Sequence, residues 1–115
     1  MRHLALVILF ACVATNAFVA VADSGAESGE TVQIRYQSHH FEPLLLTVTA
    51  GRPLTVQVIN NSQETIEFES FKLNREKSVS PGETISVKLP ALSQGSYDFY
   101  DDFHQDVPQG TIVAK

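Results

Sequence analysis

Short segments in which apolar and polar residues alternate, each ended by a turn signal, constrain the fold of this chain most. The clearest segment runs from Leu54 to Asn60, where Leu54, Val56 and Val58 share one side. A period of two residues is the pattern of a β-strand with one buried face. This segment therefore predicts a strand that packs one face against a core.

Similar segments recur along the rest of the chain. They cover residues 31–37, 44–50, 65–69, 84–89, 96–100 and 111–114, whereas residues 71–80 are expected to form a loop. Gly51-Arg52-Pro53 and Pro81-Gly82 mark turns between them, and no apolar pattern of helical length appears after residue 22. This spacing predicts an all-β fold, a Greek-key β-sandwich of about seven to eight strands.

The N-terminal residues differ from the rest. Met1-Arg2-His3 is positively charged, residues 4–22 are almost continuously apolar, and the run closes on the small-x-small pattern Ala20-Val21-Ala22. This pattern predicts a signal peptide over residues 1–22 and export of the remaining protein. A retained membrane anchor and lipidation at Cys12 are the alternatives. Residues 23–30 are expected to be a flexible lead-in, and residues 31–115 a single domain.

Charge and sulfur content narrow the possible ligands. The sequence has 8 Lys and Arg against 13 Asp and Glu, and loss of residues 1–22 removes one basic residue and no acidic one. Such an acidic balance opposes binding to nucleic acid or to anionic membranes and suits a cation. Met1 and Cys12 are the only sulfur-bearing residues. The exported domain would therefore have no disulfide, and a metal site in it would use oxygen and nitrogen ligands.

Three stretches, in this order, resemble the cupredoxin family: "FEPLLLTVTAGRPLTVQVINNS", "SVSPGETISVKLPALSQGSYDFY" and "GTIVAK". A blue-copper member of that family binds its ion through two His, a Cys and usually a weak axial Met. Here the position of the first His falls in "TIEFES" and that of the Cys falls in "DDFH". Because no thiolate is present, a blue-copper electron-transfer site is excluded.

One subgroup of the cupredoxin family matches this chain better than the blue-copper proteins do. The stretches "IEFESFKLNREKSVSPG" and "YDFYDDFHQDVPQG" resemble small exported cupredoxin-like proteins and domains associated with bacterial high-affinity iron uptake. Some of those domains carry Cys where this chain has Phe41 and Asp101. The resemblance implies six metal ligands here, namely Glu67, Glu69, Glu76, Asp101, Asp102 and His104.

The three glutamates could also be surface residues that bind no metal. Glu67 and Glu69 flank Phe68 on the expected strand, so both would leave the buried face and could simply be solvated. Glu76 lies between Arg75 and Lys77, and a surface ion pair would account for it equally well.

His104 is the strongest single candidate, because a neutral imidazole is the commonest metal ligand. Neighbouring aspartates, Asp106 among them, could bind the ion or orient the ring. The alternative is a loop histidine capped by an aspartate. His39 and His40 are adjacent, so on a strand they would face opposite sides, and at most one could reach a shared site.

These observations predict a periplasmic metal-binding protein that holds copper or iron and assists iron uptake. Its expected partner is an inner-membrane iron permease or another uptake component, and the mature form is not expected to span the membrane. Two alternatives remain open. One is an enzyme, a copper-dependent oxidase of Fe(II). The other is a metal-free sandwich that acts as an interaction subunit of a transport complex.

Overall fold

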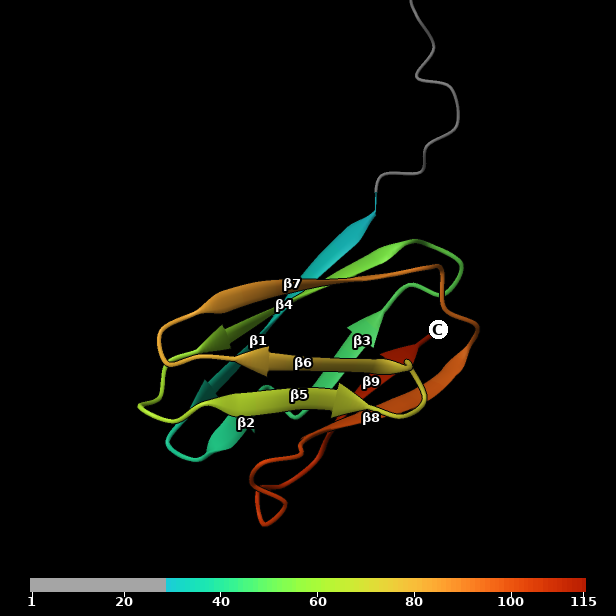
Figure 1. The fold of residues 1–115 in the computed structure, drawn as a ribbon. Coiled ribbons are helices and arrows are strands. Elements are labelled where there is room, and N and C mark those ends of the chain that lie inside the picture. Colours follow the sequence, from blue (N-terminus) through green and yellow to red (C-terminus); the bar gives the residue numbers. More distant parts are fainter. Residues whose placement is uncertain (1–28) are drawn as a thin grey trace, which may run out of the picture.

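The computed structural model describes residues 29–115, which form nine strands in two packed sheets (Figure 1). The first sheet has the order β2-β1-β4-β7 and contains β1 (Glu30–Gln37), β2 (His40–Glu42), β4 (Leu54–Asn60) and β7 (Thr84–Leu89). The second has the order β3-β9-β8-β5-β6 and contains β3 (Leu45–Val48), β5 (Ile66–Ser70), β6 (Arg75–Val79), β8 (Gly95–Asp101) and β9 (Gly110–Ala114). No helix that could cross a membrane occurs in the described residues.

The strand pairing is mixed. β1 pairs in parallel with β4, and β3 pairs in parallel with β9, while the other pairs are antiparallel. In the β5–β6 hairpin Glu69 lies opposite Glu76, and on the other side of β5 Phe68 lies opposite Asp101. This register places acidic residues from three neighbouring strands close together.

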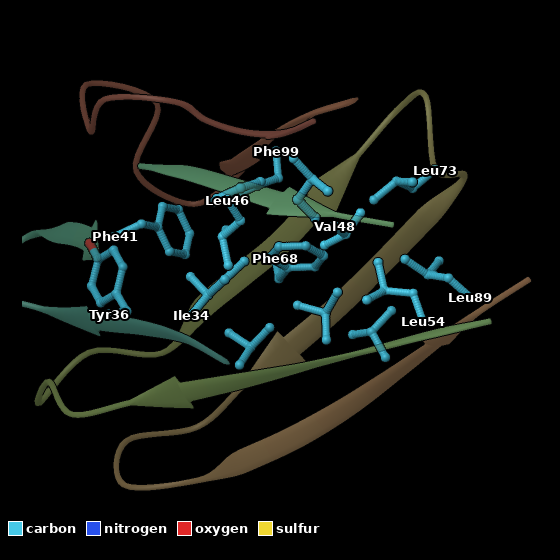
Figure 2. Close-up of a cluster of buried hydrophobic side chains, with 14 of the residues drawn as sticks. Ile34, Tyr36, Phe41, Leu46, Val48, Leu54, Phe68, Leu73, Leu89 and Phe99 are labelled. Carbon is cyan, nitrogen blue, oxygen red and sulfur yellow. The ribbon is translucent and has the colours of Figure 1, made fainter. Parts of the chain in front are cut away.

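The core lies between the sheets and is rich in aromatic rings (Figure 2). Phe41 contacts both Tyr36 and Phe99 edge to face, and Phe68 packs against Phe99 with ring centroids 5.5 Å apart. All four side chains are fully buried. Burial of a large apolar side chain contributes about 1.5–3 kcal/mol, so these rings supply a large part of the stability.

The predicted all-β sandwich is confirmed, and no residue from 29 to 115 is helical. The expected loop over residues 71–80 is wrong, because it contains strand β6. This strand has only one buried residue, Val79, and therefore no apolar alternation. A tight turn with Asn74 in the left-handed conformation (φ 53°) returns the chain onto β5, and Asn tolerates that conformation well. The predicted signal peptide lies outside the described residues.

Candidate metal centre

Three carboxylates gather on the β5–β6 hairpin. Glu67 and Glu69 are two residues apart on β5 and share a face of the sheet, and Glu76 lies opposite Glu69 on β6. One oxygen from each lies within 4.8 Å of the other two. In the described part of the chain, no other trio of His, Asp or Glu has ligand atoms this close together. Glu67, Glu69 and Glu76 are called the carboxylate trio below.

Glu67 is not a solvated surface residue, although simple alternation along the strand allowed that interpretation. Its exposure is only 7%, and its Oε1 atom is buried without a hydrogen-bond partner. The residue after β8 continues the pairing with β5, because the Asp102 N–H donates to the Glu67 carbonyl at 3.0 Å. A buried oxygen without a partner is costly, so a proton or a cation bound here would stabilise the site.

The charges around Glu67 also favour a bound proton or cation. The adjacent Glu76 carboxyl group, burial, and the charges of Asp102 and Glu69 together raise the pKa of Glu67 to about 7. Burial and a hydrogen bond to Glu69 also raise the pKa of the Tyr100 hydroxyl on β8. The trio, Asp102 and Tyr100 thus form an oxygen-rich, anionic surface. Carboxylate oxygens of this kind suit hard cations, and they also bind first-row transition ions.

The Arg75 guanidinium, next in sequence to Glu76, does not neutralise the trio. Its hydrogen bonds go to the carbonyl oxygens of Leu73, Asn74 and Lys88 instead. On the Arg75 side, the surface ion pair that the sequence allowed for Glu76 is therefore replaced by contacts to the backbone.

Asp101 has a structural position that the sequence did not indicate. It is fully buried, and its Oδ1 accepts the backbone N–H groups of Glu67 (2.9 Å) and Phe103 (3.1 Å). Its Oδ2 lies 2.7 Å from Nδ1 of His104. Because these contacts occupy both oxygens, Asp101 joins β5 to the loop after β8 and is not part of the carboxylate trio.

His104 belongs to a different group of side chains. Its Nδ1 contacts Asp101, and its Nε2 lies 3.4 Å from Oε2 of Glu64. Of the six expected ligands, the structure therefore brings the three glutamates together, with Asp102 beside them, and joins Asp101 to His104 separately. Glu64 was missed by sequence reasoning, because it is a lone acid in an irregular connection.

The two adjacent histidines diverge, but not by strand alternation, because His39 lies in the β1–β2 turn with φ 64° and only His40 belongs to β2. His40 contacts Glu42 and the carbonyl of Ser38. His39 instead lies beside His104, with ring centroids 5.5 Å apart. Only His39 can therefore share a site with His104.

Comparison with known proteins identifies the family. The family model described as "Cupredoxin-like domain" matches residues 3–114. The chain belongs to the cupredoxin-like domain family. A relative from Rickettsia prowazekii (strain Madrid E), an uncharacterized protein, is 41% identical over 85 residues, which cover 73% of this chain and 67% of the relative.

Solved structures share the fold of this cupredoxin-like domain. Auracyanin A, a "blue" copper protein from Chloroflexus aurantiacus, aligns with a TM-score of 0.64 and 18% identity, covering 76% of this chain and all of that one. The metal-binding domain of the Cu(I)-exporting ATPase CopA from Streptococcus pneumoniae D39 aligns with a TM-score of 0.66 and 10% identity, covering 74% and 84% of the two chains.

The donor set of this cupredoxin-like domain does not fit a blue-copper centre. Such a centre needs a thiolate, and residues 29–115 contain neither Cys nor Met. Within "DDFH", the side chain that contacts Nδ1 of His104 is that of Asp101, at a hydrogen-bond distance. Oxygen ligands are available instead at the carboxylate trio, which fits a harder metal ion.

Proposed function

We propose that this cupredoxin-like protein is exported, binds an iron or copper ion at the carboxylate trio, and assists iron uptake. The observation that carries the proposal is the buried, unpartnered Oε1 of Glu67 inside a cluster of three carboxylates. Clusters of exposed acids are common, but an acid buried among like charges is not. An ion at this position would supply the partner that Glu67 lacks.

Binding would replace a proton with a metal ion. With a pKa of about 7, Glu67 is partly protonated near neutral pH, and that proton reduces the repulsion with Glu76. A divalent or trivalent cation neutralises more charge than one proton does. Binding therefore releases a proton and weakens at acidic pH.

Which ion binds depends on the chemistry of the ligands and on which metal ions are available. For a given set of O and N ligands, affinity rises from Fe(II) to Cu(II), so copper competes wherever it is available. Hard carboxylate oxygens also suit Fe(III), and the resemblance of "IEFES" and "DDFH" to iron-uptake domains favours iron. Delivery of the ion to an inner-membrane iron permease is the role that we infer for the exported domain.

The test is calorimetric titration of protein recovered from the periplasm of an expressing bacterium. Fe(II) under anaerobic conditions and Cu(II) are titrated separately into the wild type, the Glu67→Gln/Glu69→Gln/Glu76→Gln variant and a Glu83→Gln control. We expect one ion to bind the wild type and the control, with at least a tenfold loss in the triple variant.

Each of the other possible results of these titrations favours a different interpretation. Absence of binding below about millimolar in a folded protein would leave the interaction-subunit alternative. Binding that the triple variant retains would place the ion elsewhere. Consumption of Fe(II) and oxygen that depends on added Cu(II) would replace simple binding with the oxidase alternative.

A further inference from the structure

Tyr100 brings a phenol oxygen to the edge of the carboxylate trio. It lies on β8 directly opposite Glu69, and Glu69 in turn lies opposite Glu76 on β6. Residues directly opposite each other on neighbouring antiparallel strands have Cβ atoms about 4.5–5.5 Å apart. Glu76, Glu69 and Tyr100 therefore form one row of oxygen-bearing side chains across three strands.

This row stands on the outer face of the sheet. Phe68 on β5 and Phe99 on β8 are fully buried in the core, so the residues that follow them, Glu69 and Tyr100, face the opposite way. The Tyr100 hydroxyl forms a hydrogen bond with the Glu69 carboxyl group. Because Glu69 already has an oxygen within 4.8 Å of the rest of the trio, the phenol extends the cluster to four oxygens.

A second row lies beside the first. Ser78 lies opposite Glu67 in the β5–β6 pairing, and on the other side of β5 the Asp102 N–H donates to the Glu67 carbonyl at 3.0 Å. The carboxyl groups of Asp102 and Glu76 are both close enough to act on the charge of the Tyr100 phenol. The phenol is thus part of a dense group of hard, anionic oxygens, which favours an ion of high positive charge.

Tyr100 is also open to solvent on one side. Together with Gln105 and Gln109, in the connection between β8 and β9, it lines a hollow of about 380 Å³. The Gln105 side chain donates to Asp102 Oδ1 at 3.1 Å. An octahedral ion held by the trio and the phenol would therefore have room for water at its remaining positions.

We propose that Tyr100 binds the metal ion together with the carboxylate trio, and that the ion taken there is Fe(III). This assignment rests on the function proposed above and specifies the oxidation state of the iron. Phenolate is a hard oxygen ligand that forms only when the ion is acidic enough to displace the hydroxyl proton. Fe(III) does this near neutral pH, whereas Fe(II) is a much weaker acid.

Binding is a ligand exchange without electron transfer. The O–H bond of Tyr100 breaks, the proton passes to water by way of the hydrogen-bonded Glu69 carboxyl group, and an Fe–O bond replaces the bond from the ion to a water ligand. Iron stays Fe(III) throughout. A phenolate bound to Fe(III) has a charge-transfer band in the visible region, which carboxylates alone do not give.

The test is visible absorption and resonance Raman spectroscopy of protein recovered from the periplasm, to which Fe(III) is added as its nitrilotriacetate complex. We expect one Fe(III) per chain and a phenolate band in the wild type. Tyr100→Phe should abolish the band and weaken Fe(III) binding at least about tenfold. The same variant should leave anaerobic Fe(II) binding nearly unchanged, a difference that a merely structural role would not produce.

The other two of the three tyrosines provide matched controls. Tyr97 lies on the same strand, but its hydroxyl donates to the Ser93 carbonyl at 2.8 Å, and Tyr36 is fully buried. Tyr97→Phe and Tyr36→Phe should therefore keep both the band and the affinity for Fe(III). The Glu67→Gln/Glu69→Gln/Glu76→Gln variant should lose both.

Failure of this assignment can be distinguished from failure of the proposed function. A wild type that binds Fe(III) at the trio without a phenolate band would refute the role of Tyr100 and leave the trio as a metal site. A band that persists in Tyr100→Phe would refute it as well. Binding of Fe(II) or Cu(II) but not of Fe(III) would overturn the ferric assignment alone, and absence of binding by any of these ions would overturn both proposals.

Discussion

Replacement of Asp101 by alanine should cost the protein a large part of its stability. Three hydrogen bonds end on this buried carboxylate, from the N–H groups of Glu67 and Phe103 and from His104 Nδ1. A hydrogen bond to a charged group is worth about 1.5–3 kcal/mol. Three of them would sum to at least about 4 kcal/mol, and water that enters the space offsets part of the loss. We therefore expect Asp101→Ala to lower the free energy of unfolding by about 3–5 kcal/mol.

Urea denaturation of the metal-free protein measures this loss. A small domain has a total stability of roughly 5–15 kcal/mol, so a variant that loses 3–5 kcal/mol is close to unfolding. Asp101→Asn is the milder companion, because its amide oxygen still accepts the two backbone N–H groups. Its amide N–H₂ cannot accept from His104 Nδ1, so we expect a loss of about 1–2 kcal/mol.

Asp98→Ala is the matched control. It lies on the same strand, is exposed, and accepts one hydrogen bond from the Thr111 hydroxyl, so its loss should stay below about 1 kcal/mol. If Asp101→Ala cost no more than this control, Asp101 would not join β5 to the loop, and the structural role assigned to it would be wrong.

Three further predictions concern single positions. Gly110→Ala should destabilise by about 1–3 kcal/mol in urea unfolding, because a Cβ there would lie 2.1 Å from Cζ of buried Phe99; unchanged stability would contradict the tight contact. Tyr36→Phe removes a buried hydroxyl that lies beside the Asp101 carboxylate but makes no hydrogen bond of ordinary geometry, so stability should change by less than about 1 kcal/mol, and a larger loss would show that Asp101 accepts a hydrogen bond from this hydroxyl. Because Glu76 and burial raise the pKa of Glu67 from 4.5 to about 7, the native state keeps a proton that the unfolded chain releases, and stability should fall as pH rises between these values. Glu67→Gln should abolish that decline in urea unfolding measured across this pH range, and an identical decline in the variant would assign it to another group.

The fold could be predicted where a strand has one buried and one exposed face. β4 alternates over its whole length and was expected with its observed bounds, Leu54–Asn60. β6 carries its only buried residue at one end, and β2 is three residues long. Neither has enough alternation to be recognised, because backbone pairing with a neighbour, and not burial of a face, forms these strands.

The site could be predicted only in part, for a related reason. Family resemblance selected Glu67, whereas strand alternation alone left it as a solvated residue, because β8, which pairs with β5, comes more than 30 residues later in the sequence. The grouping of His39, Glu64 and His104 depends on three connections that meet only in the folded chain. Residue type and resemblance supplied the candidates Glu67, Glu69, Glu76 and His104, whereas Glu64 and the division into two groups required the three-dimensional arrangement.

The position of β6 at the edge of its sheet has a consequence for how an ion would leave. β6 pairs only with β5, and buried Val79 fixes its far end in the core. Edge strands open locally at a much lower free energy than the whole domain. Local opening of β6 at Arg75 would break the contact of its guanidinium with the Lys88 carbonyl and withdraw Glu76, while Glu67 and Glu69 stay in place on an internal strand. The trio would then become a pair, so that release of a bound ion would need only a movement of β6.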